Sequence, residues 1–95
     1  MAVHNLMEDI VKACLKELMH NQPNLQILDD RMQSDVMAIA LNRLPAKYVA
    51  TAPGEVFAKT QLRMQVETDV YRELTNAVDK VLHSDRPSDL IEKND

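Results

Sequence analysis

The scarcity of glycine constrains the fold of this chain more than any other feature of its sequence. Gly54 is the only glycine in 95 residues, and β-rich domains of this size join their strands through tight turns that commonly need glycine. Aromatic residues are also scarce, at 3%. The strong helix formers Leu, Met, Ala, Glu, Lys, Gln and Arg dominate instead. The sequence therefore predicts an all-α fold.

Length and charge restrict the classes of protein to which the chain can belong. A chain of 95 residues has room for one core, so residues 1–95 are expected to form a single domain with a frayed tail over 92–95. The net charge of −4 argues against a binder of DNA or RNA. The one cysteine excludes an intrachain disulfide framework and a cysteine-rich zinc site. Without a long apolar run or a secretion signal, a cytoplasmic protein with no membrane contact is expected.

Residues 3–20 carry the clearest helical pattern in the sequence. Their apolar residues recur at alternating steps of three and one, which places them along one face of a helix. The stripe has nine members: Val3, Leu6, Met7, Ile10, Val11, Cys14, Leu15, Leu18 and Met19. Because such a stripe is more than one neighbouring helix easily covers, we expect a homodimer built partly on this helix.

A second helix is predicted before Pro45. It begins near Asp29 or Ser34, both good N-caps, and ends at Leu44, because the residue before a proline disfavours helix. Its apolar residues fall on more than one face, so it is expected to be the central helix. The short apolar stretch 24–28 before it is expected to lie over the core as a connector.

A long third helix follows a connector over residues 45–60. Within the connector, residues 48–50 are expected to run extended. The helix is predicted over Thr60–His83, with Glu55 as an alternative start, and Ser88 caps a last short helical piece. The predicted architecture is a small domain of three main helices with short helical pieces.

The second helix and its exit carry a string that resembles a known family. Residues 35–49 read DVMAIALNRLPAKYV, which is similar to the late competence development protein ComFB family: an aspartate, then Ala-Leu-Asn, a basic residue, Leu-Pro and a closing tyrosine. Residues 5–11, NLMEDIV, resemble the opening Asn-x-x-Glu element of the family, and residues 88–90 resemble the end of some members. The likeness spans about residues 4–90.

The resemblance implies a fold, an assembly and a function. It implies a small α-helical homodimer that acts as a non-enzymatic receptor for a cyclic dinucleotide, cyclic di-GMP or cyclic di-AMP, and signals to a partner protein. Some members carry a cysteine cluster that resembles a zinc site, whereas residues 27–33 here contain no cysteine. No structural zinc is carried over, and neither a metal nor a cofactor is expected.

Five residues form the candidate ligand site. A cyclic dinucleotide presents two phosphates and two flat bases, so a receptor needs cations and planar groups. Arg43 can grip a phosphate or lie over a purine, Lys47 adds a point charge, and Tyr48 supplies a ring and a hydroxyl. Asn42 can pair with a base edge. Arg63, near the start of the third helix, is expected to add a second cation.

Each of these residues also has a plain structural interpretation. Arg43 in the last turn of a helix is favourable for the helix dipole alone, and Asn42 there can satisfy free carbonyls. Tyr48 can be a core ring with its hydroxyl at the surface, while Lys47 and Arg63 can be ordinary solvated charges. The alternative function is a helical adaptor whose basic corner docks an acidic segment of another protein, without a nucleotide ligand.

No motif points to an enzyme. One glycine rules out a glycine-rich phosphate loop, and no nucleophile stands beside a base. His4, His20 and His83 share no metal-ligand spacing and are expected at the surface. Cys14 lies on the apolar stripe and is expected to be a buried structural thiol.

Overall fold

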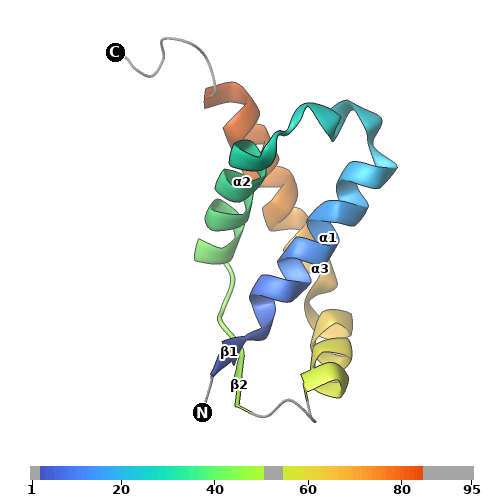
Figure 1. The fold of residues 1–95 in the computed structure, drawn as a ribbon, viewed down its shortest axis with the longest axis vertical. Helices are drawn as coiled ribbons and strands as arrows, with labels where there is room; N and C mark the ends of the chain where they lie inside the picture. Colours follow the sequence, from blue (N-terminus) through green and yellow to red (C-terminus); the bar gives the residue numbers. More distant parts are fainter. Residues whose placement is uncertain (1–2, 51–54, 85–95) are drawn as a thin grey trace.

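The computed structural model describes residues 3–50 and 55–84. Over these ranges the chain forms three long helices, a short 3-10 helix and two very short strands (Figure 1). In chain order they are β1 His4–Asn5, α1 Leu6–Asn21, η1 Pro23–Ile27, α2 Asp30–Asn42, β2 Tyr48–Val49 and α3 Glu55–Ser84. The predicted all-α architecture is confirmed. The expected helical piece after Ser88 and the tail over 92–95 lie outside the described residues.

Helix α1 begins three residues later than the sequence pattern predicted. Asn5 caps it, because its side-chain Oδ1 accepts a hydrogen bond from the Met7 amide at 3.1 Å. The preceding residues are extended, since β1 pairs antiparallel with β2, with Asn5 opposite Tyr48. Val3 therefore stands exposed outside the helix rather than in its stripe. The extended backbone expected around Tyr48 is confirmed.

The link between α1 and α2 lies over the core, as predicted. Leu25 within η1 and Leu28 just after it are buried. Asp29 then caps α2, because its Oδ1 accepts a hydrogen bond from the Met32 amide at 2.9 Å. Of the two starts that the sequence offered for α2, the one at Asp29 is therefore confirmed.

The core lies between the three helices, and α1 contributes most to it. Six stripe residues of α1 are buried within this single chain: Leu6, Met7, Ile10, Val11, Cys14 and Leu15. Within the chain, α2, α3 and η1 cover these six, whereas Leu18 and Met19 are only partly buried. The homodimer built on this helix stays a prediction. The expectation that α2 is the central helix is wrong, since it fully buries only Val36 and Ala40.

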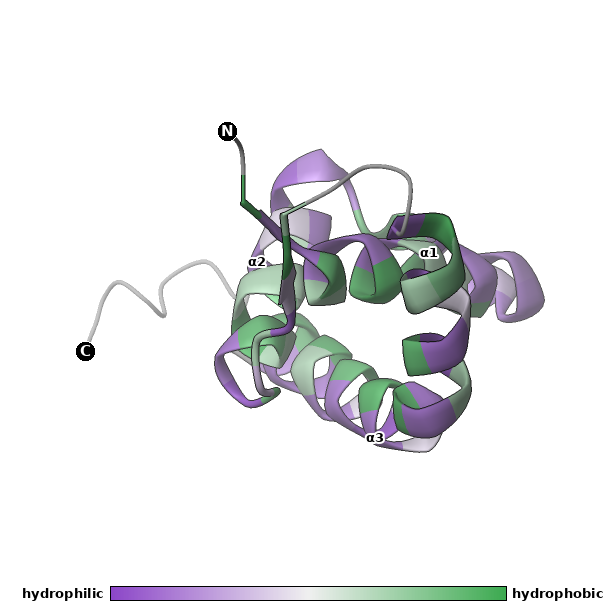
Figure 2. Ribbon diagram, turned by 90° about the horizontal axis from the view of Figure 1, so that it is seen from below, coloured by the Kyte–Doolittle hydropathy of each residue, from purple (hydrophilic) through white to green (hydrophobic). Residues whose placement is uncertain are grey.

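Helix α3 runs the length of the molecule and has two different halves. It has 30 residues, starting at Glu55, the earlier of the two predicted starts. Its second half buries Val70, Leu74, Ala77, Val78 and Val81 against α1 and α2. Its first half lies at the end of the molecule that also holds β1 and β2 (Figure 1) and exposes the large apolar residues Val56, Phe57 and Met64. Figure 2 shows that apolar and polar residues alternate along the helices.

Candidate ligand-binding site

The segment that leaves α2 presents four of the five predicted ligand residues to solvent. Arg43 is the C-cap of α2: its amide donates to the carbonyl oxygen of Ala40 at 3.0 Å, and the amide of Leu44 donates to that of Leu41 at 3.3 Å. Asn42, Arg43, Lys47 and Tyr48 are all exposed. Tyr48 keeps 65% of its surface exposed, so its interpretation as a core ring is wrong. A ring and two cations on one short exposed segment provide contacts for a base and a phosphate.

Asn5 fixes the backbone of this segment. Its Oδ1 accepts a hydrogen bond from the Lys47 amide at 3.0 Å in addition to the bond that caps α1. The Leu6 amide donates to the Lys47 carbonyl oxygen at 2.7 Å. The two parts of the sequence that resemble ComFB, around Asn5 and around Lys47, are therefore in direct contact. The sequence analysis missed this role of Asn5, although an asparagine before an apolar stripe is a recognisable N-cap signal.

Arg43 is held from its other side by a carboxylate on α3. Its Nε donates to Glu73 Oε1 at 3.1 Å, and Arg72 Nε lies 3.6 Å from Glu73 Oε2. The Glu73 side chain is 12% exposed, whereas that of Arg43 is 57% exposed. A nearly buried carboxylate thus orients a guanidinium that still faces water. No sequence spacing could have revealed this pair, because the two residues are 30 positions apart.

Arg63 lies in a different place from the other four predicted residues. Its Nη2 donates to Glu17 Oε1 at 2.8 Å and to Glu67 Oε2 at 3.3 Å. On α3 it precedes Glu73, the partner of Arg43, by ten positions, which corresponds to about 15 Å along a helix. Within one chain, Arg43 and Arg63 therefore do not approach the same phosphate. That Arg43 and Tyr48 line one pocket stays a prediction.

Arg63 lines a groove of about 480 Å³ between α1 and the first half of α3. The walls combine apolar side chains with cations and a hydroxyl: Ile10, Ala13, Val56 and Met64, with Lys59, Arg63 and Thr60, and with Asp9 and Glu67. Its volume falls in the range of about 300–1,000 Å³ that is typical of small-molecule sites. This groove is a second place where cations lie beside apolar surface.

A network of hydrogen bonds extends from Arg63, one of the residues that line this groove. Glu17 Oε1 accepts from both Arg63 and the Tyr71 hydroxyl, the latter at 2.9 Å. The Arg63 and Tyr71 bonds lower the pKa of Glu17, and the Glu17 bond raises the pKa of Arg63. Burial and the bond to Glu17 raise the pKa of Tyr71. Cys14 is buried, as predicted, and burial raises the pKa of its thiol.

A second charged cluster joins β1, α1 and α3 next to the groove. His4 Nε2 lies 2.8 Å from Asp9 Oδ2 and 3.5 Å from Glu55 Oε2, and Lys59 Nζ lies 3.1 Å from the same oxygen of Asp9. The hydrogen bond to Asp9 raises the pKa of His4, and the bonds from His4 and Lys59 lower that of Asp9. His4 was expected to be a plain surface residue, but it is half-buried and paired.

No helix within the described residues is long and apolar enough to cross a membrane. A comparison with curated proteins and one with solved structures each gave no match. The family model described as late competence development protein ComFB matches residues 4–85. That match covers most of the chain, from the His4 cluster through all three helices, and agrees with the resemblance seen in the sequence. The chain therefore belongs to the late competence development protein ComFB family.

Proposed function

We propose that this protein is a non-enzymatic receptor for a cyclic dinucleotide, cyclic di-GMP or cyclic di-AMP, and that it passes its ligand state to a partner protein. Membership of the ComFB family makes this class of ligand the first to test. The observation that carries the proposal is the exposed set of Asn42, Arg43, Lys47 and Tyr48 on a segment that Asn5 and Glu73 hold in place.

The restraint on this segment matters for affinity. A side chain or loop that is already ordered loses less conformational entropy when a ligand binds, so more of the contact energy appears as affinity. Here Asn5 fixes the backbone at Lys47, and Glu73 fixes the guanidinium of Arg43. Both restraints leave the cations and the Tyr48 ring facing water. This combination suits a small ligand with phosphates and planar bases.

Arg63 has a separate place in the proposal. In the groove between α1 and α3, Arg63, Lys59 and Thr60 offer two cations and a hydroxyl beside apolar walls. Arg63 is committed to Glu17 and Glu67, so a phosphate there must displace at least one carboxylate. Arg43 has fewer competing contacts than Arg63, because a single carboxylate, that of Glu73, accepts a hydrogen bond from its Nε. We therefore assign the main phosphate contact to Arg43 and a secondary one to Arg63.

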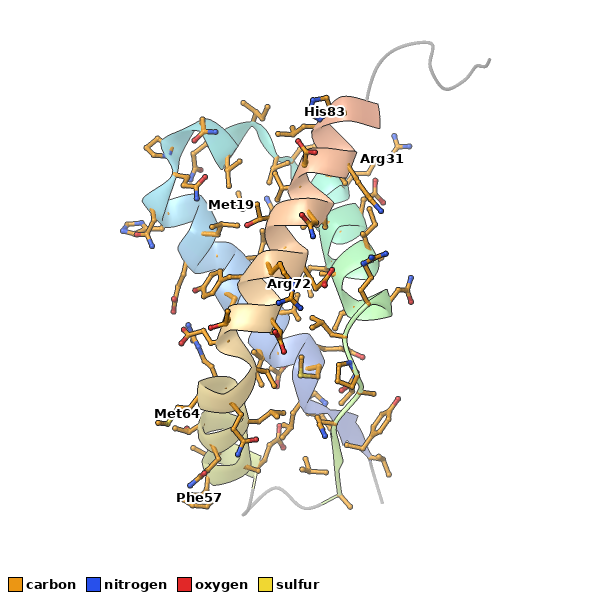
Figure 3. All side chains as sticks on the ribbon, turned by 180° about the vertical axis from the view of Figure 1, so that it is seen from behind. Met19, Arg31, Phe57, Met64, Arg72 and His83 are labelled. Atoms are coloured by element: carbon orange, nitrogen blue, oxygen red, sulfur yellow. The ribbon has the colours of Figure 1, made fainter. Side chains whose placement is uncertain are left out.

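The proposal includes a homodimer, now placed on a different surface from the α1 stripe. Val56, Phe57 and Met64, all on the first half of α3, are exposed by 72%, 69% and 78%. Phe57 and Met64 are seven residues apart, so they share one helix face, and Figure 3 shows both at the end of α3 opposite His83. A second copy pairing along this face is the occupant that we propose. A two-fold dimer also suits a nearly two-fold symmetric ligand.

Calorimetry against cyclic di-GMP, cyclic di-AMP and their linear counterparts tests the receptor function. Arg43→Ala removes one charge-assisted contact, worth about 1.5–3 kcal/mol, so binding should weaken roughly ten- to a hundredfold. Arg31→Ala is the matched control, because Arg31 is exposed at the other end of α2 (Figure 3). Arg63→Ala should weaken binding less. Equal affinity of Arg43→Ala and wild type for every cyclic dinucleotide would show that the site is misplaced.

The second candidate is a helical adaptor without a nucleotide ligand. The observation that favours it is the exposed apolar face of Val56, Phe57 and Met64, which can receive another protein as well as a second copy. The two functions differ in one simple measurement. A receptor shows a thermal shift with a cyclic dinucleotide, whereas an adaptor shows none with any member of the panel.

A further inference from the structure

Three side chains from three separate elements converge near the start of α3. His4 comes from β1, Asp9 from the first turn of α1, and Glu55 is the first residue of α3. One nitrogen of His4 and one carboxylate oxygen from each acid all lie within 4.8 Å of one another. All three side chains are partly exposed, between 27% and 40%, so an ion can reach them from solvent.

The spacing of these atoms matches the ligand sphere of a small divalent ion. Metal–nitrogen and metal–oxygen distances of about 2.0–2.2 Å place neighbouring ligand atoms roughly 3.0–3.5 Å apart in tetrahedral or octahedral geometry. His4 Nε2 lies 2.8 Å from Asp9 Oδ2 and 3.5 Å from Glu55 Oε2. The third separation, between the Asp9 and Glu55 oxygens, is within 4.8 Å, so the two carboxylates close around an ion by rotation of their side chains.

We propose that His4, Asp9 and Glu55 bind a first-row divalent metal ion, for which Zn²⁺ fits the donor set best. One imidazole nitrogen and two carboxylate oxygens suit Zn²⁺, and water from the solvent side fills its fourth position. The bound ion ties the first residue of α3 to β1 and to α1. This site uses none of the residues of the exposed segment of Arg43 and Tyr48, so the inference stands whether or not the proposed receptor function is correct.

Lys59 supplies a specific check on this site. Its ammonium lies 3.1 Å from Asp9 Oδ2, the oxygen that also contacts His4. An ammonium at that oxygen competes with a metal ion for the same charge. If the site binds metal, removing the ammonium should strengthen binding, whereas removing an acid should weaken it. A cluster that served only as an ion-pair network would show no such opposite response.

The sequence could not reveal this site through a spacing rule. His4 and Asp9 are five residues apart across a strand–helix junction, and Glu55 follows Asp9 by 46 positions. The expectation of no metal followed from the absence of a cysteine cluster and of a histidine pair on one helix, and both rules cover only ligands that are close in sequence. Here the antiparallel pairing of β1 with β2 and the position of α3 bring the ligands together.

The first experiment uses the wild-type chain, freed of metal by a chelator that is then removed. Titration with ZnCl₂ should show one site per chain by calorimetry, and ¹⁵N–¹H spectra should show the imidazole of His4 shifting while those of His20 and His83 do not. This measurement needs no variant and is independent of whether a substitution folds. Absence of zinc binding, or zinc on His20 or His83 alone, overturns the proposal.

The second experiment compares variants whose far-UV dichroism matches that of wild type. Asp9→Asn and Glu55→Gln should each weaken zinc binding by about a hundredfold or more, since even outer partners of metal ligands contribute about 10–100-fold. Lys59→Gln should bind zinc more tightly than wild type. His83→Gln is the matched control, because His83 pairs with Asp79 at 3.1 Å. Unchanged affinity in Asp9→Asn and Glu55→Gln, or weaker affinity in Lys59→Gln, refutes the site.

Discussion

Asn5 shows how one side chain can join two distant parts of this chain. Its Oδ1 accepts from the amide of Met7, which caps α1, and from the amide of Lys47, which holds the exposed segment. Loss of an N-cap costs about 0.5–2 kcal/mol and loss of a further hydrogen bond about 1 kcal/mol. Asn5→Ala should therefore lower the free energy of unfolding by about 2 kcal/mol in urea titrations.

Two further variants test whether the loss of stability comes from the two hydrogen bonds of the Asn5 side chain. Asn5→Asp keeps an oxygen at the same place and should retain most of the stability. Asn24→Ala changes an exposed residue of η1 and should stay within about 0.5 kcal/mol of wild type. An Asn5→Ala chain as stable as Asn24→Ala would contradict the double role of Asn5.

At the scale of elements, Glu17 joins α1 to α3 in a way that depends on pH. Its bonds from Arg63 and Tyr71 lower its pKa below the ordinary value of 4.5. Stability from this group is therefore present above that value and is lost as the pH falls through the lowered pKa. Glu17→Gln should be less stable than wild type at about pH 7, and the difference should shrink at about pH 4.

Urea titrations of both chains at the two pH values check this dependence. Glu8→Gln is the control, because Glu8 is an exposed acid on the same helix. A stability difference between Glu17→Gln and wild type that stays constant with pH, or grows as the pH falls, would rule out the contribution of the Glu17 carboxylate.

Because the α1 stripe is buried within one chain, a charge placed on it should unfold the protein rather than only separate two copies of it. Leu15 is 2% exposed within the single chain. Placing a carboxylate there without a partner costs several kcal/mol, a large part of the roughly 5–15 kcal/mol that stabilises a domain. Leu15→Glu should therefore lose helical far-UV dichroism, while Lys16→Glu, at the next and exposed position, should remain folded. A folded, monomeric Leu15→Glu would contradict this assignment.

These elements also show what the sequence could and could not predict. Helix periodicity, the Asp29 cap and Pro45 are local signals, and they predicted the three helices; the end of α2 was placed at Leu44, two residues after its observed end at Asn42. The partners of charged residues depend on how helices pack, so the Arg43–Glu73 pair could not be predicted. The apolar stripe of α1 suggested a dimer contact for the same reason: periodicity identifies an apolar face but does not say which segment covers it.

At the scale of the whole molecule, exposed apolar residues gather on the first half of α3, whereas most of the α1 stripe is buried. Phe57 and Met64 share a face there, and both are exposed (Figure 3). If a second copy covers this face, Phe57→Glu should place a charge in the interface and shift the chain to monomer in sedimentation at micromolar concentration. Its helical dichroism should remain, because Phe57 is 69% exposed within the chain and lies outside the core.

The same face allows a matched control and a clear contradiction. Asn76→Glu adds the same charge to an exposed position in the second half of α3, so it should leave the assembly unchanged. Because a ligand that binds only the dimer stabilises it by mass action, about 2.7 kcal/mol at a free concentration of one hundred times its dissociation constant, a cyclic dinucleotide should oppose dissociation of wild type on dilution. A wild-type chain that sediments as a monomer with and without the ligand would refute the dimer. A dimer that survives Phe57→Glu would instead place the interface elsewhere.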